Sequence, residues 1–183
     1  MGSESTASEA VTVFRWLALE GPSRRFALSI EERELARLEW ERPSGSLAVA
    51  SSGRETWTLK RLGFLQPSVT VRPRGAPTDL ARLQTQGTHH RISLANGQRF
   101  EFRRAGLLVP AWELRSMDGR RLVHIEPVRD GRRLIGAGVE VDARFANEPA
   151  LLLLLVLTFY FLVMAWAEDE LISAWTDHAE GRW

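Results

Sequence analysis

The sequence contains no cysteine and only one lysine among its 183 residues. The lack of cysteine excludes a disulfide framework, a thiolate metal site and a cysteine nucleophile, and it is compatible with a cytoplasmic location. The first residues, MGSESTASEAV, have neither the basic region nor the apolar region of a signal peptide. We therefore expect residues 1–10 to be a disordered leader of a cytoplasmic protein.

Positive charge comes almost entirely from arginine, which occurs 23 times against the single Lys60. Residues 1–149 have a net charge of +5, and residues 150–183 have a net charge of −4. Guanidinium groups bind phosphates and carboxylates in a bidentate manner. One interpretation is that the arginines solvate the outer faces of strands, and the other is that they contact anionic headgroups. The candidate contacts are three arginine doublets: Arg103 and Arg104, Arg120 and Arg121, and Arg132 and Arg133.

Apolar and polar residues alternate in short runs from residue 11 to residue 146. In QRFEFRR, for example, Phe100 and Phe102 alternate with charged residues. This period of two is typical of half-buried strands. Turn signals separate the runs at Ser44-Gly45, Ser52-Gly53, Asn96-Gly97, Asp118-Gly119 and Asp130-Gly131. The pattern predicts a mainly β fold of about twelve short antiparallel strands of nearly six residues each.

One segment, SIEERELARLEW, is open to two interpretations. Ser29 and Glu32 have the spacing of a capping box at the start of a helix. The same residues also fit a strand, an acidic turn and a second strand. We favour the second interpretation because the sequences on both sides alternate.

The only long apolar run is Ala150–Ala167. As a helix it would be about 27 Å long, at the lower limit for crossing a membrane. Pro149 suits the first turn of such a helix. However, a sheet of twelve strands must also cover its apolar face, and a closed barrel of that size can hold a helix of about 10 Å diameter. A helix in that position must be apolar on all sides, as this one is.

We therefore predict a closed antiparallel barrel over residues 11–176, with a helix over residues 149–175 threading its interior and a polar tail over residues 177–183. The alternative is a single-pass inner-membrane protein whose cytoplasmic β-domain is anchored by residues 150–167, as an accessory subunit of a membrane complex. The helix residues that would fill the barrel, or face lipid in the alternative, are Leu151, Leu154, Leu155, Thr158, Phe159, Leu162 and Trp166.

Motifs for catalysis or metal binding are incomplete. His124-Ile125-Glu126 resembles the HxE of zinc deaminases, but the required PCxxC is missing. His89-His90 has no third ligand at a suitable spacing, so we interpret it as the start of a strand. Gly136-Ala137-Gly138 lacks the context of a nucleotide loop and predicts a kink or bulge near the closure of the barrel. We expect no cofactor, no metal and no enzymatic activity.

The order of elements resembles the tubby C-terminal-like barrel family, which includes LURP-one-related proteins and phospholipid scramblases. The resemblance rests on the last strand running into the apolar helix, LIGAGVEVDARFANEPALLLLLVLTFYFLVMAW, and on the hairpins WELRSMDGRRLVHIEP and WTLKRLGFLQPSVTVR. It implies a barrel threaded by its C-terminal helix. For function it implies a binding or adaptor module at membrane surfaces, with an anionic phospholipid or a protein as partner. Nucleic acid is not expected, because the net charge is only +1.

Overall fold

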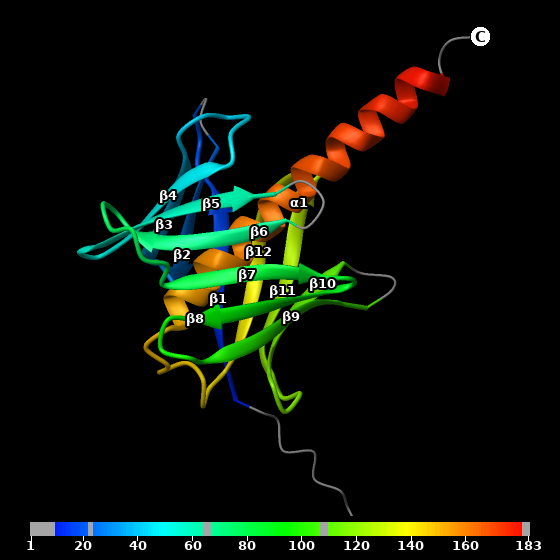
Figure 1. The fold of residues 1–183 in the computed structure, drawn as a ribbon. Coiled ribbons are helices and arrows are strands. Elements are labelled where there is room, and N and C mark those ends of the chain that lie inside the picture. Colours follow the sequence, from blue (N-terminus) through cyan, green and yellow to red (C-terminus); the bar gives the residue numbers. More distant parts are fainter. Residues whose placement is uncertain (1–9, 22–23, 64–66, 107–109, 181–183) are drawn as a thin grey trace, which may run out of the picture.

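The computed structural model describes residues 10–21, 24–63, 67–106 and 110–180, with helix side chains described as far as residue 167. In these residues twelve antiparallel strands form one closed barrel in which each strand pairs with the next and β12 pairs with β1 (Figure 1). The predicted fold class is confirmed. The strands are β1 (Val11–Ala18), β2 (Arg25–Ile30), β3 (Arg33–Trp40), β4 (Leu47–Ser52), β5 (Glu55–Leu62), β6 (Ser68–Pro73), β7 (Ala81–Gln86), β8 (His89–Leu94), β9 (Arg99–Ala105), β10 (Ala111–Ser116), β11 (Arg121–Asp130) and β12 (Arg133–Asp142).

The turns between strands follow the glycines of the sequence. Gly97 and Gly131 have φ angles of 89° and 58°, which side chains with a Cβ rarely adopt. The ambiguous segment forms β2 and β3, joined by a turn in which Glu31 has a φ of 52°. The strand, turn and strand interpretation is therefore confirmed. Strand lengths range from six to ten residues, so the expected length of six holds for only part of the barrel.

The helix α1 (Leu151–Glu180) passes through the interior of the barrel. Four consecutive residues, Leu154 to Leu157, are at most 1% exposed, so this part of the helix presents no side to solvent. Aromatic rings from the strands pack on it: Trp40 stacks on Tyr160 with 5.3 Å between ring centroids. The apolar run is thus the core of the barrel, and the inward faces of the strands surround it.

The bounds of the helix differ from the prediction of 149–175. Pro149 lies in the turn before α1, whose first residue is Leu151. At the other end α1 continues to Glu180, through four residues of the expected polar tail. Residues 1–9 of the expected leader and 181–183 of the tail lie outside the described residues.

The seven helix residues named from the sequence mostly lie in the core. Leu151, Leu154, Leu155, Thr158, Phe159 and Leu162 are at most 4% exposed, and Trp166 is half-buried where the helix leaves the barrel. The hydroxyl of Thr158 donates a hydrogen bond to the carbonyl of Leu154 at 2.8 Å, which satisfies it inside the apolar interior. Within the helical residues whose side chains are described, no segment has the length and hydropathy needed to cross a membrane.

The course of α1 distinguishes the two ends of the barrel. We call the end where α1 leaves the barrel the exit end. Of the described residues between strands, it contains 19–21, 24, 41–46, 63, 67, 87–88, 106, 110 and 131–132. The helix begins at the opposite, entry end, where Gln98 Nε2 donates a hydrogen bond to Glu148 Oε1 at 3.1 Å. The exit end is marked by two bonds from α1 to the connections, from Tyr160 to the Ser46 carbonyl and from Trp166 Nε1 to the Arg132 carbonyl.

The barrel closes next to a glycine that no other residue could replace without movement. Gly136 of β12 pairs with Leu17 of β1, and a Cβ added to Gly136 would lie 2.2 Å from the carbonyl oxygen of Trp16. The β11–β12 register shifts between Val128 and Arg129, which makes a bulge beside this glycine. The predicted kink or bulge near the closure is confirmed.

Candidate functional site: an arginine-lined pocket at the exit end

A hollow with charged walls lies beside α1 at the exit end. Its volume is about 590 Å³, and it is bounded by the β1–β2 connection, the β11–β12 connection and the helix. We call it the exit pocket and define it by its four arginines, Arg24, Arg25, Arg132 and Arg133, together with Asp130, Phe26, Leu134, Val163 and Trp166. The arginines come in two pairs separated by more than 100 residues, and closure of the barrel brings them together.

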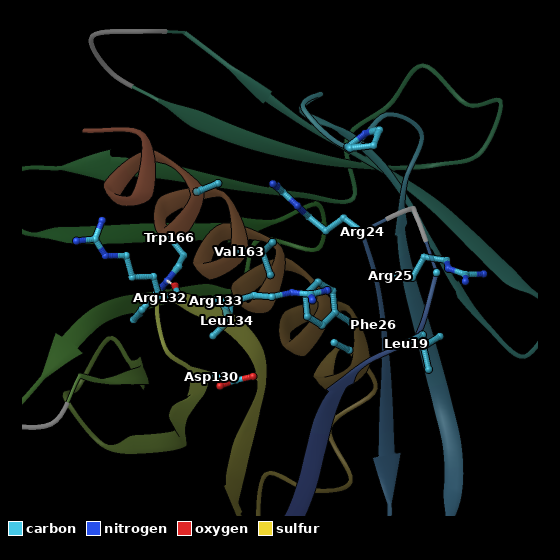
Figure 2. Close-up of a pocket in the computed structure, with 14 residues that line it drawn as sticks. Leu19, Arg24, Arg25, Phe26, Asp130, Arg132, Arg133, Leu134, Val163 and Trp166 are labelled. Carbon is cyan, nitrogen blue, oxygen red and sulfur yellow. Dashed lines mark hydrogen bonds between the residues drawn. The ribbon is translucent and has the colours of Figure 1, made fainter. Parts of the chain in front are cut away.

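The arginines of the exit pocket have different orientations (Figure 2). Arg24 and Arg133 reach into the space between the two connections and the helix. The guanidinium groups of Arg25 and Arg132 point away from that space. The centre of the pocket therefore has two cationic groups from opposite walls, and the other two arginines lie at its edge.

On the side of the barrel core, the wall of the exit pocket is apolar. Phe26, Leu134 and Val163 are 4–7% exposed and form part of the core of the barrel. Asp130 contributes a carboxylate to the lining. The pocket thus combines a cationic upper part with an apolar floor.

Trp166 fixes the helix against the β11–β12 connection. Its Nε1 donates a hydrogen bond to the Arg132 carbonyl at 2.8 Å, and the guanidinium of Arg129 lies 5.3 Å from the centroid of its ring. A cation at this distance over an indole is attracted by about 0.5–1 kcal/mol at exposed sites. The helix and the arginine connection therefore hold one another in place.

Arg25 is held by the backbone and has a donor without an acceptor. Its Nη2 donates a hydrogen bond to the carbonyl of Glu20. Its Nε is buried and has no hydrogen-bond partner among the described residues. Arg24 is stabilised differently, since its guanidinium lies 5.6 Å from the centroid of the Trp40 ring.

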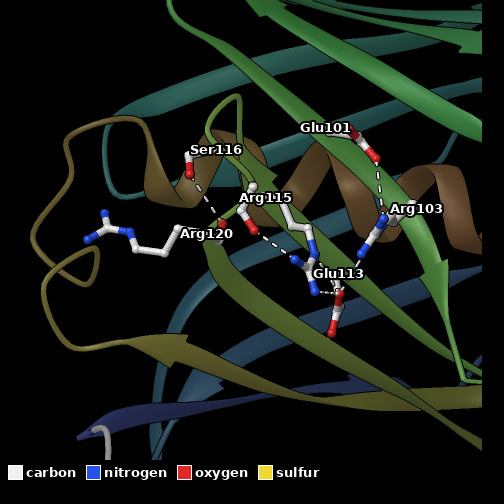
Figure 3. A network of polar contacts seen from close by, with 7 residues as sticks. Glu101, Arg103, Glu113, Arg115, Ser116 and Arg120 are labelled. Atoms are coloured by element: carbon white, nitrogen blue, oxygen red, sulfur yellow. Dashed lines mark hydrogen bonds and ion pairs between the residues drawn. The ribbon is translucent and has the colours of Figure 1, made fainter.

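Arg103, which the sequence suggested as an anionic-surface contact, belongs to an ion-pair network on the barrel wall (Figure 3). It lies 3.9 Å from Glu101 and 4.0 Å from Glu113. Glu113 is only 8% exposed and accepts hydrogen bonds from Arg115, whose Nε lies at 2.8 Å. This network neutralises Arg103 and covers Glu113, so both residues have a structural role on the outer face of β9 and β10.

The remaining predicted arginines lie at opposite ends. Arg104 is exposed near the end of β9 that faces the exit end. Arg120 and Arg121 are exposed at the entry end, in and after the β10–β11 turn. The three doublets therefore do not form one surface, and only Arg132 and Arg133 line the exit pocket.

The histidines form no metal centre among the described residues. His90 is 7% exposed and packs against Phe161 of α1 with 4.3 Å between ring centroids. Burial, with a smaller contribution from the neighbouring His89, lowers the pKa of His90 to about 4. His124 contacts Glu126 at 3.1 Å, as expected for a strand histidine beside a surface glutamate.

Arg24 and Arg25 were not among the arginines predicted from the sequence to contact an anionic surface. The signal was present in the sequence as the pair in GPSRRF, which follows a glycine and a proline and runs into the first residue of a strand. The sequence does not show that this connection and the one with Arg132 and Arg133 line the same hollow beside α1. That neighbourhood depends on the pairing of β1 with both β2 and β12.

No protein-family model, curated protein or solved structure matches this chain. The likeness to the tubby-like barrels therefore rests on the order and arrangement of the elements. It stays a prediction, whereas the threaded barrel is a property of the structure itself.

Proposed function

We propose that the chain is a non-enzymatic binding module of the tubby-like barrel type that acts at anionic membrane surfaces through its exit end. The observation that carries the proposal is the exit pocket, where arginines from two distant connections converge beside the emerging helix. Guanidinium groups are the side chains best suited to phosphate and carboxylate recognition. The resemblance to tubby-like barrels, which include phosphoinositide-binding proteins, supports the same class of function.

The interior of the barrel offers no room for a ligand along the buried part of α1. Leu154, Phe159 and Tyr160 are each fully buried against the inward faces of the strands. A partner must therefore bind to the outer wall or to an end of the barrel. This favours the exit end, which has the hollow with four arginines.

The connections at the exit end carry an excess of arginine, whereas α1, which leaves the barrel there, continues in the sequence with acidic residues. Counting these connections and two strand residues on each side, the exit end has the arginines Arg24, Arg25, Arg42, Arg61, Arg104, Arg129, Arg132 and Arg133, against Glu20, Glu39, Glu41 and Asp130. Large apolar side chains are exposed near it as well, since Leu17, Leu62 and Val128 are 56%, 41% and 48% exposed. Basic side chains together with exposed apolar ones are typical of surfaces that adsorb to anionic membranes.

The three arginine doublets provide a matched test of this proposal. Each doublet is changed to glutamate in the full chain, which alters the net charge by the same amount in every variant. Flotation is measured with vesicles of phosphatidylcholine alone and with vesicles that also contain phosphatidic acid. The folded state of every variant is checked by its thermal melt.

We expect wild-type protein to float with the anionic vesicles and not with phosphatidylcholine alone. The variant at Arg132 and Arg133 should lose more than tenfold in binding, because each arginine near an anionic surface contributes about 1 kcal/mol. The variant at Arg120 and Arg121 should stay within about twofold, since these residues lie at the entry end and charges beyond about 10 Å are screened at 0.1 M salt.

Two results would contradict the proposal. Equal loss in the variants at the two ends would show that net charge alone matters. No flotation of the wild type would exclude an anionic membrane and leave a protein as the partner. The variant at Arg103 and Arg104 is informative in another way, because it should also lower the melting temperature by breaking the pair with Glu113.

A further inference from the structure

We infer that two copies of this chain associate through the outer face of β1, β12 and β11, with a two-fold axis that runs along β12. We call this surface the β12 face and define it by Val13, Arg15, Leu17, Glu126, Val128 and Gly138. The inference goes beyond the proposed function and does not rest on it. The partner it names is a second copy of the same chain.

Strand β1 carries apolar side chains on both of its faces. Phe14 and Trp16 are buried in the core of the barrel. Val11, Val13 and Leu17 lie on the opposite, outer face and are exposed. A strand with one face in solvent usually alternates apolar and polar residues, whereas a strand covered on both faces has a nearly continuous apolar sequence. The composition of β1 is therefore that of a strand whose outer face is also covered.

Exposed apolar side chains are concentrated on and beside the β12 face. Six large apolar side chains are exposed in the described part of the chain, and four of them lie on β1 or β11: Val11, Val13, Leu17 and Val128. Leu17 and Val128 flank the same residue, because Gly136 pairs with both of them from opposite sides. Single exposed apolar residues are common on protein surfaces, but a contiguous patch of them marks an interaction site.

Opposite charges lie in the next row of the β12 face. Gly138 of β12 pairs with Arg15 of β1 on one side and with Glu126 of β11 on the other. Arg15 is exposed, and the side chain of Glu126 is 62% exposed although it contacts His124 at 3.1 Å. A Cβ added to Gly138 would meet no atom within 4 Å, so the space above this strand is open. The face thus presents a cation on one side of β12 and an anion on the other.

This distribution of charge is complementary to itself. A two-fold axis along β12 places β1 of each copy opposite β11 of the other copy, so every contact is made twice. Leu17 then lies opposite Val128 of the second copy, and Arg15 lies opposite its Glu126. An anionic membrane does not suit the same face, because Glu126 and the two acidic residues of β12, Glu140 and Asp142, outnumber Arg15.

Glu140 limits the strength of this contact. It lies two residues after Gly138 on the same face of β12 and is exposed. The axis along β12 brings the Glu140 carboxylates of the two copies near each other, and like charges at short distance repel. Glu140→Gln removes this repulsion and should tighten the association several-fold.

The association is measured on the full chain by sedimentation velocity without vesicles. As the protein concentration is raised, we expect the mass to increase from that of one chain, 20.7 kDa, to that of two. Arg15→Glu and Glu126→Arg each place like charges opposite one another and should weaken the association at least tenfold. Arg54→Glu makes the same charge change as Arg15→Glu in the exposed turn between β4 and β5, and it should leave the association within about twofold of wild type.

A mixture of the two charge variants tests the symmetry. When one chain carries Arg15→Glu and the other carries Glu126→Arg, each substituted position faces an opposite charge on the other chain. The mixture should therefore form dimers at concentrations at which neither variant does so alone. Thermal melts establish that each variant is folded.

Three results would overturn the inference. The first is a wild-type chain that stays a monomer up to about 1 mM. The second is a dimer that both Arg15→Glu and Glu126→Arg leave unchanged, which would place the contact on another surface. The third is a loss of association in both variants without recovery in their mixture, which would exclude the axis along β12.

The dimer and the membrane proposal can fail separately. Flotation of a monomeric wild type would overturn the dimer alone, and a dimer that does not float would overturn the membrane function alone. Because the dimer covers Leu17 and Val128, its adsorption to vesicles would depend on the arginines of the exit end and on Leu62.

Discussion

The ring of Trp16 on β1 stacks on the ring of Phe159 in α1, with 4.4 Å between centroids and 4° between planes. Trp16 is 1% exposed and Phe159 is fully buried, so the stack lies inside the barrel. It joins the first strand to the helix across most of the length of the chain. The strand that closes the barrel therefore depends on the helix that fills it.

Removal of the Phe159 ring tests this dependence. We expect Phe159→Ala to lower the free energy of unfolding by about 3–5 kcal/mol, as for other buried aromatic residues replaced by alanine. Chemical denaturation followed by circular dichroism gives the value. A loss below about 1 kcal/mol would show that the ring contributes little to packing.

A charge inside the barrel should have a much larger effect than the same charge outside. Leu154→Arg places an unpaired guanidinium at a fully buried position of α1, and we expect the whole domain to unfold. Leu17→Arg is the matched control, since Leu17 is 56% exposed on the outer face of β1. The near-ultraviolet spectrum and the thermal melt distinguish the two variants. A cooperative melt in Leu154→Arg at the wild-type temperature would mean that the helix is not the core.

Two glycines of β12 provide a test of barrel closure. Gly136→Ala puts a Cβ 2.2 Å from the carbonyl oxygen of Trp16, and the backbone must move to accept it. We expect a loss of about 1–3 kcal/mol in the free energy of unfolding, typical of overpacking. Gly138→Ala meets no atom within 4 Å and should change stability by less than about 0.5 kcal/mol. Equal effects of the two substitutions would contradict the close approach of β12 to β1.

His90 makes the stability of the barrel depend on pH. Above pH 6.5 the histidine is neutral in the folded and the unfolded chain, so it has no effect. Between pH 6.5 and about 4 the unfolded chain binds a proton that the folded chain, with its lowered pKa, does not bind. The free energy of unfolding therefore falls as the pH falls through this window, by about 3 kcal/mol in total.

Denaturation at a series of pH values measures this fall. His90→Phe removes the titrating group and keeps an aromatic ring against Phe161 and Trp112. The free energy of unfolding of wild type relative to that of His90→Phe should be constant well above pH 6.5 and should fall between pH 6.5 and about 4. Parallel curves over the whole range would show that His90 titrates equally in both states.

The sequence predicted the barrel and its threaded helix for two reasons. The strands are set by local periodicity, and their apolar faces must all be covered by one apolar element. The strand faces alternate, and only Ala150–Ala167 is apolar enough on all sides to cover them. His90 was interpreted only as the start of a strand, although it has the same parity as Ile92 and Leu94 and could have been placed inside.

The exit pocket could not be predicted in this way, because it depends on contacts between distant parts of the chain. The pairing of β1 with β12 sets which connections are neighbours, and α1 then decides which of them line a hollow. In the sequence, the doublet Arg120 and Arg121 and the doublet Arg132 and Arg133 were equal candidates for contact with an anionic surface, because both are pairs of adjacent arginines. In the barrel, connections that follow odd-numbered strands, such as β11–β12, lie at the exit end. Connections that follow even-numbered strands, such as β10–β11, lie at the entry end, so the two doublets are apart.

Because the chain contains no cysteine, a single introduced cysteine gives a unique position for a polarity-sensitive label. Two exposed positions test the proposal that the exit end meets an anionic surface: Pro43→Cys at the exit pocket and Met117→Cys at the entry end. After addition of vesicles with phosphatidic acid, we expect a blue shift of the label at position 43 and no change at position 117. A shift at position 117 alone, or equal shifts at both, would contradict it.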